Sequence, residues 1–129
     1  MAAQASSLKD TQELTSADFS APSARRVFPR RAAKWTVDVK TTKGQTIQGK
    51  TINVSREGLL ISLSVGPKLG DKLFVDTIVF HKGNRLNLQG VAIVKHNSIQ
   101  GSHFNIGLQF TVATELTTKF LDKYASNEI

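Results

Sequence analysis

The segment from residue 104 to 110 alternates strictly between apolar and polar residues, and this alternation constrains the fold more than any other feature. Its apolar members are every second residue: Phe104, Ile106, Leu108 and Phe110. Successive side chains of a β-strand point to opposite faces, so a period of two indicates a strand with one buried face. The segment therefore predicts a half-buried strand.

Further stretches of the chain have the same strand-like texture and are separated by turn residues. Gly44, Gly58, Gly70 and Gly83 fall between these stretches, and Gly90 indicates a bulge or bend inside the longest one. The expected strands cover residues 35–39, 45–54, 59–63, 73–80, 85–96 and 104–110. Short strands at roughly ten-residue spacing favour a small antiparallel barrel or sandwich.

The last part of the chain has a helical pattern instead. Thr114 is a suitable N-cap for a helix that extends to about Tyr124. Glu115 near its start and Lys123 near its end suit the helix dipole. The apolar residues form one stripe, which we expect to pack on the barrel: Leu116, Phe120, Leu121 and Tyr124.

Five of the seventeen Lys and Arg residues lie within ten positions, where a polar tail gives way to strand-like sequence. They are Arg25, Arg26, Arg30, Arg31 and Lys34. Pro29 lacks an N–H group and favours extended geometry in the residue before it, which argues against a plain helix here. Guanidinium groups bind phosphate or the guanine edge in a bidentate manner and stack on bases. A solvated basic tail is the competing interpretation.

The charge of the chain is distributed unevenly. The net charge is +7, but residues 1–24 hold Lys9 against Asp10, Glu13 and Asp18, so the remainder carries +9. We expect residues 1–24 to form a flexible tail and residues 25–129 to form one domain. The basic domain points to an anionic partner: a nucleotide, a nucleic acid or a membrane surface.

A second group of polar residues follows the second expected strand. Asn53, Ser55 and Gly58 form an Asn-x-Ser-x-x-Gly motif. Asn53 and Ser55 share one face of an extended chain and can accept hydrogen bonds from a guanine edge. Gly58 would allow a positive φ that closes the turn. These residue types are also common in ordinary turns.

Several kinds of chemistry lack a sequence pattern. The chain has no cysteine, and His81, His96 and His103 have no metal-ligand spacing, so we expect surface histidines, the last two flanking a loop. Ser55 has no partner pattern for nucleophilic catalysis. There is no apolar run of about eighteen residues and no secretory signal pattern. We therefore expect a cytoplasmic, non-enzymatic protein without a metal or cofactor.

Taken in order, Arg-x-x-x-Arg, Asn-x-Ser-x-x-Gly and the strand 105–110 before a helix resemble the PilZ domain, a family of bacterial cyclic di-GMP receptors. The resemblance covers about residues 25–124. It implies a six-stranded antiparallel β-barrel with a C-terminal helix and a flexible N-terminal arm. It also implies that the chain binds cyclic di-GMP and signals to a protein partner when the arm becomes ordered over the ligand.

The resemblance assigns a ligand-binding role to residues of both motifs. Arg26 and Arg30 would bind phosphate and guanine, and Asn53, Ser55 and Gly58 would line the guanine edge. Arg25 precedes the first motif, where an arginine in this family accompanies binding of a stacked cyclic di-GMP dimer. Arg31 and Lys34 lie outside the motif and would give electrostatic support.

Two other functions remain as alternatives. A small barrel that binds single-stranded nucleic acid would need exposed aromatic residues interleaved with a basic groove. Here the aromatics fall mostly at core positions and the cations gather on one arm, which counts against nucleic acid. An adaptor that has lost the ligand would not need the intact pair of motifs.

Overall fold

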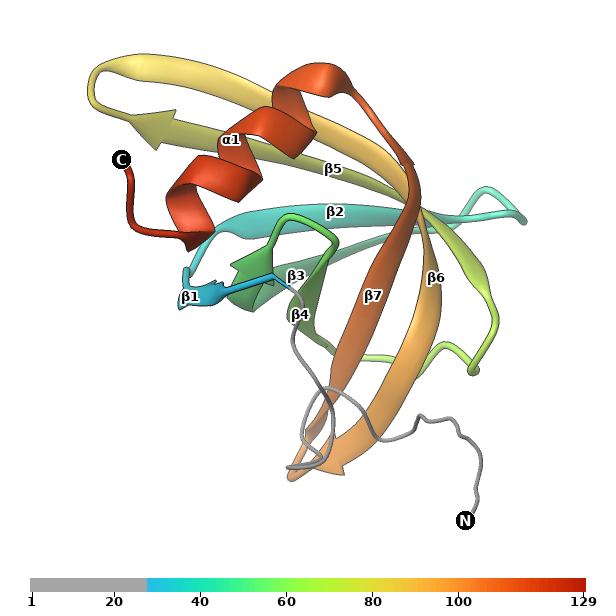
Figure 1. Cartoon of the computed structure of the whole chain (residues 1–129). Helices are drawn as coiled ribbons and strands as arrows, with labels where there is room; N and C mark the ends of the chain where they lie inside the picture. The colour runs from blue at the N-terminus through green and yellow to red at the C-terminus, as the bar shows by residue number, and fades with distance from the viewer. Residues whose placement is uncertain (1–27) are drawn as a thin grey trace, which may run out of the picture.

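Seven β-strands and one α-helix build the part of the chain that the structure describes, residues 28–129 of this computed structural model. Figure 1 shows how these elements are arranged. They are β1 (Arg30–Ala32), β2 (Thr36–Thr41), β3 (Thr46–Ser55), β4 (Gly58–Leu63), β5 (Lys72–His81), β6 (Asn84–Gln100), β7 (His103–Ala113) and α1 (Glu115–Ala125).

Six of the strands close into an antiparallel barrel. The ladder runs β3–β2–β5–β6–β7–β4, and the pairing of β4 with β3 completes the ring. The expected six-stranded barrel is therefore confirmed. The short strand β1 pairs with the end of β3, while β2 pairs with its beginning. The part of the basic arm that the structure describes is thus paired with the barrel wall.

The barrel core is filled by the inward-facing residues of each strand. On β5, for example, burial alternates residue by residue along the whole strand. Burying one such aliphatic side chain contributes about 1.5–3 kcal/mol. The largest fully buried side chains are Leu59, Ile61, Leu63, Leu73, Leu88, Ile106, Leu108, Leu121, Val37, Val39, Val54 and Val94.

Helix α1 packs on the barrel beside β1, β3 and β6 through Phe120, Leu121 and Tyr124 of its predicted stripe, whereas Leu116 is 48% exposed. Thr114 caps it by accepting a hydrogen bond from the Thr117 backbone N–H at 3.2 Å. Trp35 packs against this helix, with ring centroids 6.0 Å from Phe120 and 5.1 Å from Tyr124. The helix therefore covers the short link between β1 and β2.

Two expectations about histidines were wrong. His81 ends β5 and is half-buried, with its ring 5.4 Å from that of Phe120. His96 and His103 do not flank a loop, because β6 continues to Gln100 and β7 begins at His103. The tight turn between β6 and β7 uses Gly101 at φ +62°. The polar residues after His96 hid this strand, because its ladder depends on backbone hydrogen bonds rather than on apolar side chains.

Within residues 28–129, no helix has the length and apolar character needed to cross a membrane.

Candidate ligand-binding site

Strand β1 brings the first sequence motif against the second. Its register with β3 places Arg30 opposite Ser55 and Ala32 opposite Asn53. Directly opposed residues of an antiparallel pair have Cβ atoms about 4.5–5.5 Å apart and share a face. Arg30, Asn53 and Ser55 therefore lie together on the outer face of the barrel. Of the predicted site residues, Arg25 and Arg26 lie outside the described part of the chain.

The neighbouring arginine has a different role. Arg31 lies opposite Val54, whose side chain points into the core, so the pleat directs Arg31 away from the face of Arg30. Its guanidinium donates to the main-chain oxygens of Tyr124 at 3.1 Å and Ile129 at 2.9 Å. It also lies 4.1 Å from the centroid of the Tyr124 ring.

Arg31 thus joins β1 to the end of α1, a role that sequence reasoning missed. Cations suit helix C-termini because unpaired carbonyl oxygens gather there. We expected Arg31 to give only electrostatic support to the ligand site. Instead it forms specific hydrogen bonds with the main chain at the end of α1. A strand period applied to the pair Arg30 and Arg31 could have indicated that their side chains face opposite ways.

The turn between β3 and β4 carries the second motif and contacts the arm. The Ser55 hydroxyl oxygen accepts a hydrogen bond from the Glu57 backbone N–H at 3.2 Å, and Ser55 is only 2% exposed. The guanidinium of Arg56 lies 4.7 Å from the ring centroid of Phe28, a cation–π contact. Ser55 therefore stabilises the turn, and Arg56 adds a second guanidinium beside the arm.

The expected reason for Gly58 was wrong. Its φ does not lie in the left-handed region. A Cβ at this position would lie 1.9 Å from the backbone oxygen of Leu108. Glycine is required because β4 and β7 approach each other closely here.

Two amide side chains on this outer face have buried, unsatisfied acceptors. The Oδ1 atoms of Asn53 and Asn105 have no hydrogen-bond partner in the part of the chain that the structure describes. A buried acceptor without a partner costs about 1–3 kcal/mol. In the same cross-strand row as Asn53 are Leu60 of β4, Gly107 of β7 and His96 of β6.

The electrostatics of this face combine cations with a half-buried histidine. Arg30 and Arg56 supply guanidinium groups at the arm and the turn, and burial lowers the pKa of His96. Within residues 28–129, no group of three or more His, Asp or Glu side chains is placed to hold a metal ion. The arrangement offers guanidinium donors and amide acceptors on one face, which suits a planar anionic ligand.

Comparisons with known proteins agree with this description. A family model described as PilZ domain matches residues 24–125. No curated protein matches the chain.

Two solved structures match the chain. The Bacillus subtilis inhibitor of motility (MotI/DgrA) superposes with a TM-score of 0.73 at 16% identity, over 81% of this chain and 51% of that one. This chain therefore spans about half the length of that protein. The PilZ domain of CeSA from a cellulose synthesizing bacterium superposes with a TM-score of 0.49 at 16% identity, over 77% of this chain and 96% of that one.

Proposed function

Because the chain belongs to the PilZ domain family of cyclic di-GMP receptors, we propose that it binds cyclic di-GMP on the outer face formed by β1, β3 and β4. Domains of this family are ligand-binding modules that work with protein partners rather than typical enzymes. In this proposal Arg26 and Arg30 bind phosphate and guanine, and Asn53, Ser55 and Gly58 form the floor beneath the guanine edge.

One observation carries the proposal: β1 places Arg30 and the unsatisfied Asn53 acceptor on the same face. A guanine offers N1–H and N2–H₂ donors that would satisfy the Asn53 oxygen. The Arg30 guanidinium would bind the phosphate or the O6/N7 edge. Ser55 would contribute mainly by holding the turn, because its hydroxyl oxygen already accepts from the Glu57 N–H.

The structure suggests a route from the ligand to the helix. Arg30 faces the proposed ligand, and Arg31, the next residue, donates to backbone oxygens of Tyr124 and Ile129. A ligand that holds β1 on β3 would therefore also strengthen the attachment of α1. In this way the ordering of the N-terminal arm would change a surface that a downstream protein partner contacts. We propose that this signalling takes place in the cytoplasm.

The alternative of a single-stranded nucleic-acid-binding barrel has less support. Such a surface needs exposed aromatics among cations. Two exposed aromatics do lie opposite cations, Phe74 opposite Lys40 and Phe80 opposite Arg85. The next outward-facing pair beside Phe74, however, is Asp76 and Asp38. Carboxylates beside the aromatic ring would repel phosphates.

Calorimetric titration with cyclic di-GMP tests the proposal, with GTP and a single-stranded oligonucleotide as controls. We expect tight binding of cyclic di-GMP alone. A stoichiometry of two ligands per chain that falls to one in Arg25→Ala would support a stacked dimer. Absence of binding, or tight oligonucleotide binding that weakens steeply with salt, would contradict the proposal.

A further inference from the structure

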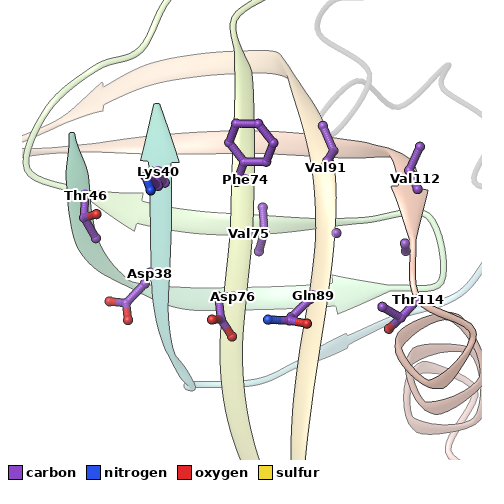
Figure 2. Close-up of a pocket in the computed structure, with 12 residues that line it drawn as sticks. Asp38, Lys40, Thr46, Phe74, Val75, Asp76, Gln89, Val91, Val112 and Thr114 are labelled. Atoms are coloured by element: carbon purple, nitrogen blue, oxygen red, sulfur yellow. The ribbon is translucent and has the colours of Figure 1, made fainter. Parts of the chain in front are cut away.

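The outer face of β2, β5, β6 and β7 carries a groove of about 650 Å³ that the proposed cyclic di-GMP site does not use. Figure 2 shows the side chains that line it. Neither motif contributes to this groove, since Arg30, Asn53 and Ser55 lie on the β1–β3 face. It therefore has to be explained separately from the ligand site.

One wall of the groove is largely apolar. Phe74, Val91 and Val112 are successive neighbours across β5, β6 and β7, and the row continues through Lys40 of β2 to Thr46 of β3. Phe74 is 45% exposed and Val112 is 65% exposed. Figure 2 shows these side chains in one row across the strands. They do not fill the barrel core, so Phe74 and Val112 leave apolar surface open to solvent along this wall.

The other wall is acidic and polar. Asp38 and Asp76 lie directly opposite each other where β2 pairs with β5, and Gln89 lies opposite Asp76 on β6. Like charges in this relation destabilise a sheet. Asp38 accepts one hydrogen bond, from Gln48 Nε2 at 3.4 Å. Among residues 28–129, no Lys or Arg forms an ion pair with either carboxylate.

The floor between the two walls is main chain. Val75, Gly90 and Ala113 form the intervening cross-strand row, whose side-chain positions point inward. A Cβ on Gly90 would lie 2.8 Å from the Phe110 ring, so glycine is needed for packing beneath the groove. The groove thus runs across the strands, with an apolar side and an acidic side.

We propose that this groove is the docking site of a protein partner that presents an amphipathic segment with apolar side chains beside Lys or Arg residues. The apolar side chains would cover Phe74 and Val112. The basic side chains would lie beside the opposed Asp38 and Asp76, on the side of the groove away from Lys40. The basic chain as a whole repels a basic segment. The segment should therefore bind at the acidic side of this groove rather than elsewhere on the surface.

Heteronuclear NMR of the ¹⁵N-labelled full chain provides the test, with a short amphipathic helical peptide of Leu and Lys as the probe. We expect shift changes at amides of β2, β5 and β6 that line the groove, and none with the same pattern of Leu and Glu. The Asp38→Asn/Asp76→Asn double variant should weaken binding about tenfold or more. Phe74→Ala should do the same.

Two further variants separate loss of peptide binding from loss of the fold. Val112→Thr replaces a residue that is 65% exposed and tests the same wall if Phe74→Ala unfolds. Ile99→Ala, at a 71% exposed apolar residue of β6 outside the groove, should leave peptide binding unchanged.

Three results would overturn the proposal. The first is shift changes that fall on another face or are equally strong with the Leu/Glu peptide. The second is unchanged affinity in the Asp38→Asn/Asp76→Asn variant. The third is a chain that dimerises through Phe74 and excludes the peptide, because the occupant would then be a second copy.

Discussion

Arg30 lies directly opposite Ser55 where β1 pairs with β3, so the two sequence motifs meet on one face of the barrel. The next residue, Arg31, bonds to the end of α1 instead. Two adjacent arginines therefore serve two different faces. This separation allows the effects of ligand binding and of stability to be measured independently.

Arg30→Ala and Arg31→Ala should affect different properties, ligand binding and stability respectively. Removing Arg30 should weaken cyclic di-GMP binding by about 2–5 kcal/mol, the scale for truncating one member of a desolvated charge pair. Removing Arg31 should lower the free energy of unfolding by about 1–3 kcal/mol, because it loses two charged hydrogen bonds and the contact with Tyr124.

Calorimetry and chemical denaturation of both variants would check this pair. If Arg30→Ala binds cyclic di-GMP with the affinity of the parent chain, Arg30 is not part of the binding site. A loss of stability in Arg30→Ala as large as that in Arg31→Ala would show that both arginines are structural.

Asn53→Ala should weaken binding without weakening the fold. The Asn53 Oδ1 atom is a buried acceptor that no described residue satisfies. Deleting it should cost about 1–3 kcal/mol of cyclic di-GMP binding, while the free energy of unfolding should stay equal to that of the parent or rise, because a buried acceptor without a partner is removed. A marked drop in the melting temperature would mean that Asn53 supports the turn instead.

The barrel could be predicted from the sequence because its signals are local. Alternation along residues 104–110 and the glycine turns gave the strands, and the order of the motifs identified the family. Strand β1 could not be predicted, since three residues carry no periodicity and their pairing with β3 is non-local. The continuation of β6 beyond His96 was hidden for a similar reason, because backbone pairing extends it.

The candidate site was predictable as a set of residues but not in its division of roles. Motif spacing indicated Arg30, Asn53, Ser55 and Gly58. Only the three-dimensional register shows that Arg31 faces the helix, and only the close approach of β7 explains Gly58. Arg25, Arg26 and the boundary at residue 24 remain predictions, because residues 1–27 lie outside the described part.

Gly58→Ala should destabilise the barrel itself. The added Cβ would lie 1.9 Å from the Leu108 oxygen, so the backbone of β4 or β7 must move. Overpacking of this kind costs about 1–3 kcal/mol. Gly44→Ala is a useful comparison, since its site is spatially open and only its φ of +87° opposes a side chain. Thermal melts of both variants should place Gly58→Ala lower, and the reverse order would contradict the close-approach explanation.

His96 should make the fold less stable in mild acid. Burial lowers the pKa of His96 below its ordinary value of 6.5, so the unfolded chain binds a proton at a higher pH than the folded chain does. Stability should therefore fall as the pH drops below about 6.5 and level off below the folded pKa. Denaturation of His96→Gln across this range should show a weaker pH dependence, and an unchanged pH dependence would assign it to other groups.

Thr51 of β3 holds the link between β1 and β2 through one buried hydroxyl, so it tests whether β1 must be held in place for binding. Its Oγ1 donates to the Ala33 oxygen at 2.6 Å and accepts from the Trp35 N–H at 2.8 Å. Thr51→Val would leave both backbone groups without this partner, at a cost of about 1–3 kcal/mol of stability. Thr51→Ser keeps the hydroxyl and should lose less stability.

Thr77 gives the matched control, because its buried hydroxyl donates to the Thr36 oxygen at the β2–β5 pair, away from β1. Thr77→Val should therefore lose stability but retain cyclic di-GMP affinity, whereas Thr51→Val should lose both. Equal affinities in the two folded valine variants would show that the ligand does not depend on the position of β1.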